Sequence, residues 1–384
     1  MVLNNVKLIG ADEPVNIQIV GCHIAKAGKK TLAENSGHLQ LTFDNALAFP
    51  GLINSHDHLD FNLFPQFGDK TYNNYTEWGK HIHEQYPDEI AEILKIPIIL
   101  REEWGMLKNL FCGVTTVVNH GEKVQTKSNL IGIHEQCQCI HSVGFEKNWK
   151  FKINRFRKKR APVVIHAGEG IDYSSQREIS QLIKWNILQK KLIGVHAVAM
   201  SATQAQKFKA VVWCPQSNFF LLDKTAPVNE LKNHTNILFG TDSTLTGSWD
   251  IWEHIRDARK TGLLSDDELY NSLSSNAAMA WQTCNAKFEP GKKADVVVAR
   301  IKNNKDTLNS FFSTTPEDIL LVLRNGEIQL FDAEVKKQLT DTDLSGFSKV
   351  YINGACKYIN YNVPGLMKEI RHYYPKVSFP VMVG

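Results

Sequence analysis

The sequence predicts an α/β fold, in which repeated strand–helix units surround a parallel sheet and a small β domain lies beside them. From Ala48 to about Pro290, short runs rich in β-branched residues alternate with longer amphipathic stretches. Strand-like runs without such helices fill residues 1–50 and return near Pro290. The strands before and after the central region can therefore form one small domain.

The first elements are three apolar runs broken by turn residues, and they predict strands within 6–9, 15–20 and 38–43. The strand candidates of the central region share short runs of apolar residues, and they are 51–55, 115–119, 139–144, 163–166, 192–196, 211–214 and 237–241, with 149–153 as a weaker eighth. The helix candidates share amphipathic spacing, and they are 97–111, 175–188 and 249–259. A capping box from Ser265 to Glu268 predicts the start of one more helix.

After Pro290 the sequence predicts strands at 295–298 and 319–323, the latter followed by the tight-turn pair Asn325-Gly326. Residues 351–361 are expected to include a hairpin, and 363–374 are expected to form a helix. The predicted domains are a composite β-sandwich from 1–49 and 287–335, a catalytic unit from 50–286, and an extension of unassigned role from 336–384.

Composition indicates a globular chain that acts on a small molecule. Of 384 residues, 43% are hydrophobic and 22% are charged, and the net charge is only +4. The dense basic cluster at 147–160 lacks an aromatic stacking platform, so we expect a solvated surface and no nucleic-acid partner. No apolar run approaches the length of a membrane span and no leader opens the chain, so no membrane partner is expected. Seven cysteines without paired spacing are typical of reduced thiols in the cytoplasm.

The pair His56 and His58 ends the first central strand. Alternate side chains of a strand face the same side, so the two imidazoles can converge on one point and suit zinc or iron. The chain repeats the pattern at His81 and His83, in a polar stretch. That second pair is interpreted as surface residues, because no apolar strand carries it.

Three more strands end in residues that bear chemistry. His166 ends the run 163–165, and Glu169 follows it closely enough to carry protons. His196 ends 192–195, and Asp242 follows 237–241. A carboxylate beyond so apolar a strand needs a partner, and a metal ion or a histidine would supply one. Strand ends converge on one face of a βα barrel, so these residues and the first histidine pair are expected to meet.

The ordered motifs resemble those of the amidohydrolase superfamily. They are Pro-Gly-Leu-Ile-Asn-Ser-His-Asp-His from Pro50, Gly-Val-Thr-Thr from Gly113, His-Ala-Gly-Glu from His166, His196, Cys-Pro-Gln-Ser-Asn from Cys214, Gly-Thr-Asp from Gly240, and Pro-Gly-Lys-Lys-Ala-Asp from Pro290. The sequence is most similar to the branch of cytosine, guanine and adenosylhomocysteine deaminases and triazine chlorohydrolases. The resemblance runs from about Ala48 to Leu330.

The resemblance implies a (β/α)8 TIM-like barrel with a small β-sandwich. It implies that one divalent transition metal, zinc or else iron, is held by His56, His58, His166 and Asp242. His196 would orient water or substrate, Glu169 would shuttle a proton, and Asp242 would also accept the proton of the attacking water. The implied activity is the release of ammonia from a small aminated nitrogen heterocycle.

Some features depart from the family pattern. The stretch from Gly113 to His166 is short, so the third and fourth strand–helix units are expected to be abbreviated. The predicted substrate contacts share positions near the strand ends, and they are Asn119, His120, Trp78 and Asn218. The aromatic stretch 60–86 is interpreted as a pocket wall or as loop packing, His141 as a core histidine, and Cys214 as a structural thiol.

Two alternative functions stay open at this stage. One is hydrolysis of a cyclic amide or of another C–N bond at two metals, with Lys150 or Lys152 in the weak strand as a carboxylated bridge. The other is a barrel without catalysis that serves as a scaffold, although all the expected ligands are present. A homo-oligomer is also compatible with the sequence.

Overall fold

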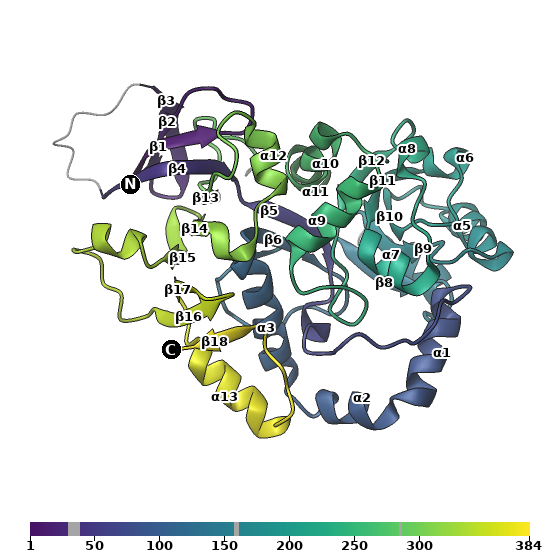
Figure 1. The fold of residues 1–384 in the computed structure, drawn as a ribbon. Helices are drawn as coiled ribbons and strands as arrows, with labels where there is room; N and C mark the ends of the chain where they lie inside the picture. Colours follow the sequence, from purple (N-terminus) through teal and green to yellow (C-terminus); the bar gives the residue numbers. More distant parts are fainter. Residues whose placement is uncertain (30–38, 157–160, 284–285) are drawn as a thin grey trace.

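The computed structural model describes residues 1–29, 39–156, 161–283 and 286–384. They form a parallel barrel flanked by a large mixed sheet (Figure 1). Two sequence predictions extend into these gaps. The predicted strand 38–43 begins at His38, and the basic cluster 147–160 ends with residues 157–160, and these positions lie outside the described residues.

The barrel consists of a three-stranded and a five-stranded parallel sheet. The first contains β5 (Leu52–Asp57), β6 (Val114–Asn119) and β7 (Gly132–Ile133). The second contains β8 (Gln138–Ser142), β9 (Val163–Ala167), β10 (Leu192–His196), β11 (Phe208–Trp213) and β12 (Asn236–Phe239). A parallel bridge between Asp57 and Asp242 joins the ends of the first and last strands, which closes the ring at that side.

The third and fourth units are abbreviated, as the sequence predicts. Residues 120–131 and 134–137, which flank β7, contain no helix. The predicted strand at 149–153 is wrong, because this segment is helix α4 (Trp149–Ile153). Its two buried residues, Trp149 and Ile153, are four apart, which places both on one face of a helical turn. Lys150 and Lys152 therefore do not lie on a barrel strand.

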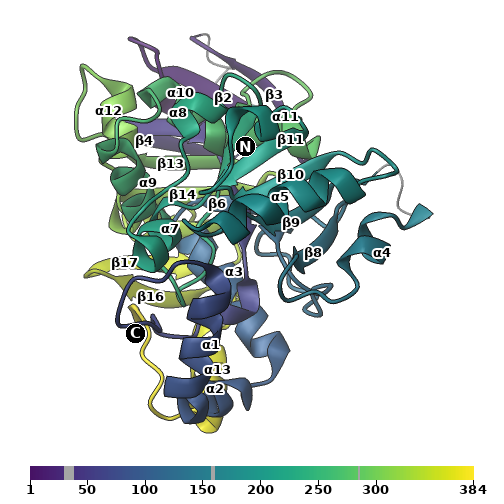
Figure 2. The same cartoon turned by 90° about the vertical axis from the view of Figure 1, so that its right-hand side faces the viewer.

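The remaining helices lie around the barrel, and the last helix of the chain packs beside the large sheet (Figures 1 and 2). The predicted ones are found, within a few residues of their expected bounds, as α3 (Ile98–Phe111), α5 (Tyr173–Trp185), α9 (Ile251–Lys260) and α10 (Asp266–Leu273). The capping box of Ser265 and Glu268 is formed at the start of α10. The helix expected at 363–374 is also found, as α13 (Val363–Tyr373). The others are α1 (Tyr75–Gln85), α2 (Pro87–Leu94), α6 (Ala202–Ala205), α7 (Pro215–Leu222), α8 (Val228–Leu231), α11 (Ser275–Trp281) and α12 (Thr307–Phe312).

The large sheet combines both ends of the chain. Its order is β18-β16-β17-β15-β14-β13-β4-β1-β2-β3. The N-terminal strands are β1 (Val2–Leu8), β2 (Val15–Val20), β3 (His23–Gly28) and β4 (Gln40–Pro50). The late strands are β13 (Val296–Arg300), β14 (Ile319–Arg324), β15 (Glu327–Asp332), β16 (Ser348–Ile352), β17 (Ala355–Ile359) and β18 (Val381–Val383). The expected hairpin near 351–361 is β16–β17, so the last segment of the chain continues this sheet.

The central strands of the large sheet are buried on both faces. In β13, Val297 packs into the core shared with the barrel, whereas Val296 and Val298 pack into a second core on the opposite face. This alternation follows from the two-residue period of a strand. The sheet is therefore anchored to the barrel rather than tethered by a linker. The sequence-based domain boundaries remain a prediction.

Among the helices in the described part of the chain, none combines the length and apolar character required to cross a membrane.

Candidate metal centre and active site

The four expected metal ligands meet at one end of the barrel. His56 and His58 lie at the end of β5, His166 lies in β9, and Asp242 follows β12. All four are buried, and one ligand atom from each lies within 4.8 Å of the others. Asp242 Oδ1 is 3.2 Å from His56 Nε2 and 3.4 Å from His58 Nε2, and the Nε2 atoms of His56 and His166 are 3.2 Å apart.

Backbone hydrogen bonds at the closure of the barrel hold three of these ligands in register. His58 N donates to Asp242 O over 2.9 Å, and Asp242 N donates to His56 O over 3.1 Å. Asp242 adopts a φ of 64°, in the left-handed region that non-glycine residues seldom occupy. Such strained conformations are concentrated at functional sites, because the surrounding structure must impose them. The local backbone is thus built to direct this carboxylate inward.

The ligand set fits a transition metal. Three imidazole nitrogens and one carboxylate oxygen are the donors that zinc and iron accept. Asp242 Oδ2 accepts hydrogen bonds from Ser217 Oγ and Thr246 Oγ1, both over 2.8 Å, which leaves Oδ1 for the cluster. When both nitrogens are unprotonated, as metal ligands are, the Nε2 lone pairs of His56 and His166 lie close together, and a bound cation would remove this conflict.

The protonation states also fit a metal. Burial raises the pKa of Asp242, but the hydrogen bond from His56 and the nearby histidines outweigh it, so the pKa falls well below its ordinary value. Burial, followed by the charges of His120 and His196, lowers the pKa of His166 well below 6.5. The carboxylate is ionised and this imidazole is neutral at neutral pH, which are the forms that bind metals.

A second group overlaps the first and contains the expected proton-transfer residues. Glu169 Oε2 lies 3.6 Å from His196 Nε2 and 3.8 Å from His166 Nδ1. Burial raises the pKa of Glu169 well above its ordinary value, and the negative charge of Asp242 raises it further. A carboxyl group with a raised pKa can both accept and release a proton near neutral pH. Its environment is therefore suited to proton transfer.

The ring of His196 is oriented by a neighbour. Asn218 Nδ2 donates to His196 Nδ1 over 3.0 Å, so His196 carries its proton on Nε2, the nitrogen that faces Glu169. Burial lowers the pKa of His196 to about 3, so the ring is neutral. Asn218, expected to contact substrate, thus acts on His196 in this structure.

The loop that carries Glu169 is fixed by a hydrogen bond to Glu178 on α5. Glu178 Oε1 accepts a hydrogen bond from Gly168 N over 2.9 Å, and its Oε2 accepts one from Tyr75 Oη over 3.1 Å. Gly168 has a φ of 66°, and a Cβ at this position would lie 2.4 Å from Ile179 Cδ1. Glycine meets both constraints without strain, so it suits the turn between His166 and Glu169.

His120 is the expected substrate contact that lies closest to the ligands. It is 2% exposed, and neither ring nitrogen has a hydrogen-bond partner. Its ring stacks on His166 with a centroid distance of 4.5 Å and an interplanar angle of 29°. It lies outside the group of ligand atoms. A buried imidazole without partners is costly, so this position is suited to a bound polar group.

The other expected contacts serve different purposes. Asn119 Oδ1 accepts a hydrogen bond from Leu59 N over 3.0 Å, so this amide fixes the loop after β5. Trp78 Nε1 donates to Phe67 O over 2.7 Å, while the residue lines a cavity.

His141 was expected in the core, but it is exposed to this same cavity, with its ring 5.0 Å from that of His166. Strand alternation directs it to the cavity face.

The second histidine pair is away from the ligand cluster, as expected. His81 and His83 lie on α1. His81 Nε2 pairs with Asp69 Oδ1 over 2.9 Å, and His83 Nδ1 is 2.8 Å from Gly79 O.

Sequence reasoning did not identify the buried ion pair behind the ligands. Asp57 lies between the two histidines of β5 but faces the other way, and both it and Lys108 of α3 are buried. Lys108 Nζ is 3.1 Å from Asp57 Oδ2. The same carboxylate accepts side-chain amide hydrogen bonds from Asn54, Asn62 and Asn109. The position of Asp57 between two candidate ligands was the available signal, whereas Lys108 had none.

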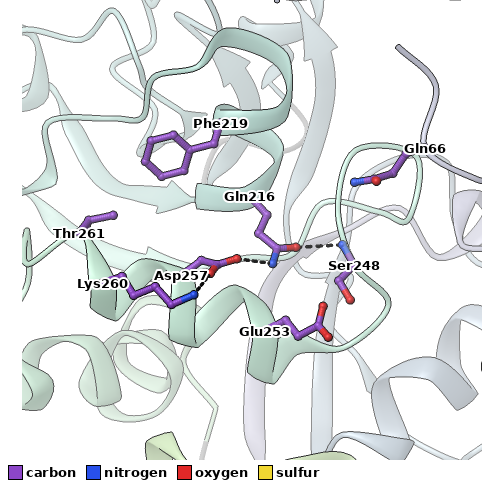
Figure 3. Close-up of a pocket in the computed structure, with 8 residues that line it drawn as sticks. All are labelled: Gln66, Gln216, Phe219, Ser248, Glu253, Asp257, Lys260 and Thr261. Atoms are coloured by element: carbon purple, nitrogen blue, oxygen red, sulfur yellow. Dashed lines mark hydrogen bonds and ion pairs between the residues drawn. The ribbon is translucent and has the colours of Figure 1, made fainter. Parts of the chain in front are cut away.

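Two large cavities open near this end of the barrel. One, of about 750 Å³, lies between α7 and α9 (Figure 3) and contains none of the candidate ligands. Its polar groups bind one another: Asp257 Oδ2 accepts from Gln216 Nε2 over 2.7 Å, and Lys260 Nζ pairs with Asp257 Oδ1 over 2.8 Å. The other, of about 710 Å³, is lined by Phe61 and His141, which both contact ligand rings. Only the second cavity borders the ligand cluster.

Comparison with known proteins agrees with this geometry. Residues 142–328 match the model of the amidohydrolase family. A 5-methylthioadenosine/S-adenosylhomocysteine deaminase of Caldanaerobacter subterraneus subsp. tengcongensis is 22% identical over 418 aligned positions, which cover 88% of this chain and 94% of the relative.

Two solved structures superpose on most of the chain. An adenosine deaminase of Xanthomonas campestris with bound zinc has a TM-score of 0.67 and 15% identity, and the superposition covers 98% of each chain. A guanine deaminase of C. acetobutylicum with bound guanine has a TM-score of 0.66 and 15% identity, covering 85% of this chain and 99% of that one. The predicted barrel class is therefore confirmed.

The match to the family model over residues 142–328 and the relatives named as deaminases fit the amidohydrolase superfamily and its deaminase branch, as the motifs led us to expect.

The buried ion pair behind the ligands yields a stability prediction. Lys108→Met leaves Asp57 buried without its cation, so we expect the free energy of unfolding to fall by about 3–5 kcal/mol. Urea denaturation at equal metal saturation measures this change. Lys80→Met, at a side chain that is 77% exposed, is the matched control and should shift stability by less than about 0.5 kcal/mol. Equal stabilities of the two variants would contradict the role of the pair.

Proposed function

We propose that this protein is a metal-dependent hydrolase that deaminates a small aminated nitrogen heterocycle and releases ammonia. The observation that carries the proposal is the position of Glu169. This buried carboxyl group, with its raised pKa, lies between His166 and His196 at the edge of the four-ligand cluster. The arrangement brings a group that transfers protons next to a site that can hold a metal.

His56, His58, His166 and Asp242 would hold one divalent metal, and zinc is favoured because it is bound in the superposed adenosine deaminase. When bound, such a metal supplies a water whose pKa falls from about 15.7 to roughly 7. A second ion at His166, Glu169 and His196 would require His166 to bind through both ring nitrogens. This requirement favours one metal over two.

The protein side chains divide the proton transfers of the reaction. The water oxygen adds to the ring carbon that carries the amino group, while Glu169 takes one proton from this water and delivers it to the ring nitrogen. Asp242 accepts the second proton of the same water, and Glu169 relays it to the amino group, so both protons of the water end on nitrogen. The carbon–nitrogen bond breaks, ammonia leaves, and the ring keeps the oxygen. The neutral His196 donates a hydrogen bond through Nε2 and so stabilises the oxygen as it gains negative charge.

His120 would hydrogen-bond the heterocycle. Both of its nitrogens are buried and without partners, and its ring lies against His166 at the cluster. A ring nitrogen or an exocyclic group of the substrate would satisfy it. Trp78 would contact substrate through its ring face, since its Nε1 is already bonded to Phe67 O.

We also propose that the protein works in the cytoplasm on small molecules alone. The absence of paired cysteine spacing in the sequence and the small net charge support this part of the proposal.

Substitution of the proposed proton carrier tests the function. A screen of aminated purines, pyrimidines, pterins and triazines should find ammonia release by the wild-type protein. Glu169→Gln should then lower turnover by about 10²–10⁴-fold, because the amide cannot carry the proton, while metal content stays unchanged. Ammonia assays and elemental analysis of the same samples measure both quantities. Unchanged turnover in Glu169→Gln would remove this residue from the mechanism, and no ammonia from any ring would refute the deaminase.

Substitution of His120 tests its contact with substrate. His120→Phe keeps an aromatic ring but removes both nitrogens, so we expect kcat/KM to fall by about tenfold or more with full metal content. Steady-state kinetics on the best substrate of the screen measure the change. His372→Phe, at an exposed position of α13 outside the cavity, is the control and should match the wild type. Loss of metal from His120→Phe would instead make this residue a ligand.

A further inference from the structure

The cavity beside the ligand cluster is built from apolar side chains. It has a volume of about 710 Å³, and its wall is formed chiefly by the aromatic stretch after β5 and by α1 and α2. The apolar residues that line it are Phe61, Phe64, Phe67, Trp78, Ile82, Ile90, Leu94, Phe145 and Leu245. Phe64, Phe67 and Ile82 are at most 6% exposed, so the deep part of the wall is rigidly packed.

This cavity adjoins the candidate metal ligands at two points. The ring of Phe61 stacks on that of His58 with a centroid distance of 5.3 Å and an interplanar angle of 13°. On the other side, the ring of His141 lies 5.0 Å from that of His166. Two ligands thus form contacts with residues of the cavity wall. A heterocycle held at the ligands would therefore lie beside this space.

The charged groups of the cavity are on its rim and are poorly placed to bind an ionised substituent. Lys80 and Glu84 lie one helical turn apart on α1, 3.8 Å from each other, and their side chains are 77% and 58% exposed. His83 is bonded to Gly79 O. Among the lining residues, no buried cation is present to bind a carboxylate. Transfer of an ionised group into this wall would be unfavourable, whereas an alkyl group would gain from burial.

We propose that this cavity is a specificity subsite for a neutral apolar substituent, so that the substrate is an aminated heterocycle with an alkyl or thioether arm rather than an ionised one. The proposal rests on the deaminase function above and narrows its substrate class. The named relative acts on a ring with either kind of arm, the methylthio group of 5-methylthioadenosine or the amino-acid group of S-adenosylhomocysteine. The wall of this chain favours the first kind.

Binding to an inactive variant separates this proposal from the proposed reaction. Glu169→Gln holoenzyme is titrated calorimetrically with matched sets of aminated purine, pyrimidine and triazine, each with a hydroxyl, a methylthio or an amino-acid arm. We expect the methylthio member to bind at least tenfold more tightly than the amino-acid member on any ring that binds. Equal affinity of the arms, tighter binding of the ionised arm, or no binding by any set would overturn the subsite, whatever the ammonia assay shows.

A charge placed on the rim provides a second test that does not depend on core packing. Leu94 is 48% exposed and lines the cavity, so Leu94→Arg, in the same inactive background, should fold and offer a cation to the amino-acid arm. The preference for the methylthio arm should fall at least threefold. Ile99→Arg, at a residue that is 41% exposed and outside the cavity, is the matched control and should keep it. An unchanged preference in Leu94→Arg, or the same loss in both, would contradict the proposal.

Discussion

The candidate metal centre depends on the closure of the barrel between β5 and the segment after β12. The bridge between Asp57 and Asp242, with the backbone hydrogen bonds on either side of it, sets the spacing of three of the four candidate ligands. His166, on the opposite sheet, completes the set. A shift of one residue in this pairing would turn both histidines of β5 away from the centre, because strand side chains alternate. The chemistry therefore requires this register.

A buried ion pair between Asp57 and Lys108 stabilises the closure on the face of β5 opposite the ligands. The side chain of Asp57 points away from the ligands and is bound by Lys108 and three asparagine amides, so the alternation of β5 has a polar partner on each face. Burying such an ion pair costs free energy, because both charges lose their water. We infer that it is retained because it fixes one arrangement of the backbone. Here it connects α3 to the end of β5. The positive φ of Asp242, in the segment after β12, also costs conformational free energy, and it too is retained where it fixes one arrangement.

The sequence was sufficient to predict that the four candidate ligands lie together, since each ends or follows an apolar strand and such strands converge in a barrel. It was not sufficient where length or periodicity is lost. β7 has two residues and no β-branched run. α4 has only enough residues for one turn, so its alternation of Trp149, Phe151 and Ile153 with two lysines was misread as a strand. The cavity combines residues from three distant segments, and the position of His141 on its wall depends on that packing. Only the three-dimensional structure could reveal it.

The metal content of the purified protein tests the central claim most directly. We expect elemental analysis, after removal of loosely bound ions, to find about one zinc per chain, because four ligands converge on one point and the adjoining group shares His166. Asp242→Asn should lower this value, since it removes the charge of the only carboxylate in the ligand set. About two metals per chain would contradict the single centre. A wild-type protein that retains no transition metal would contradict metal-dependent hydrolysis altogether.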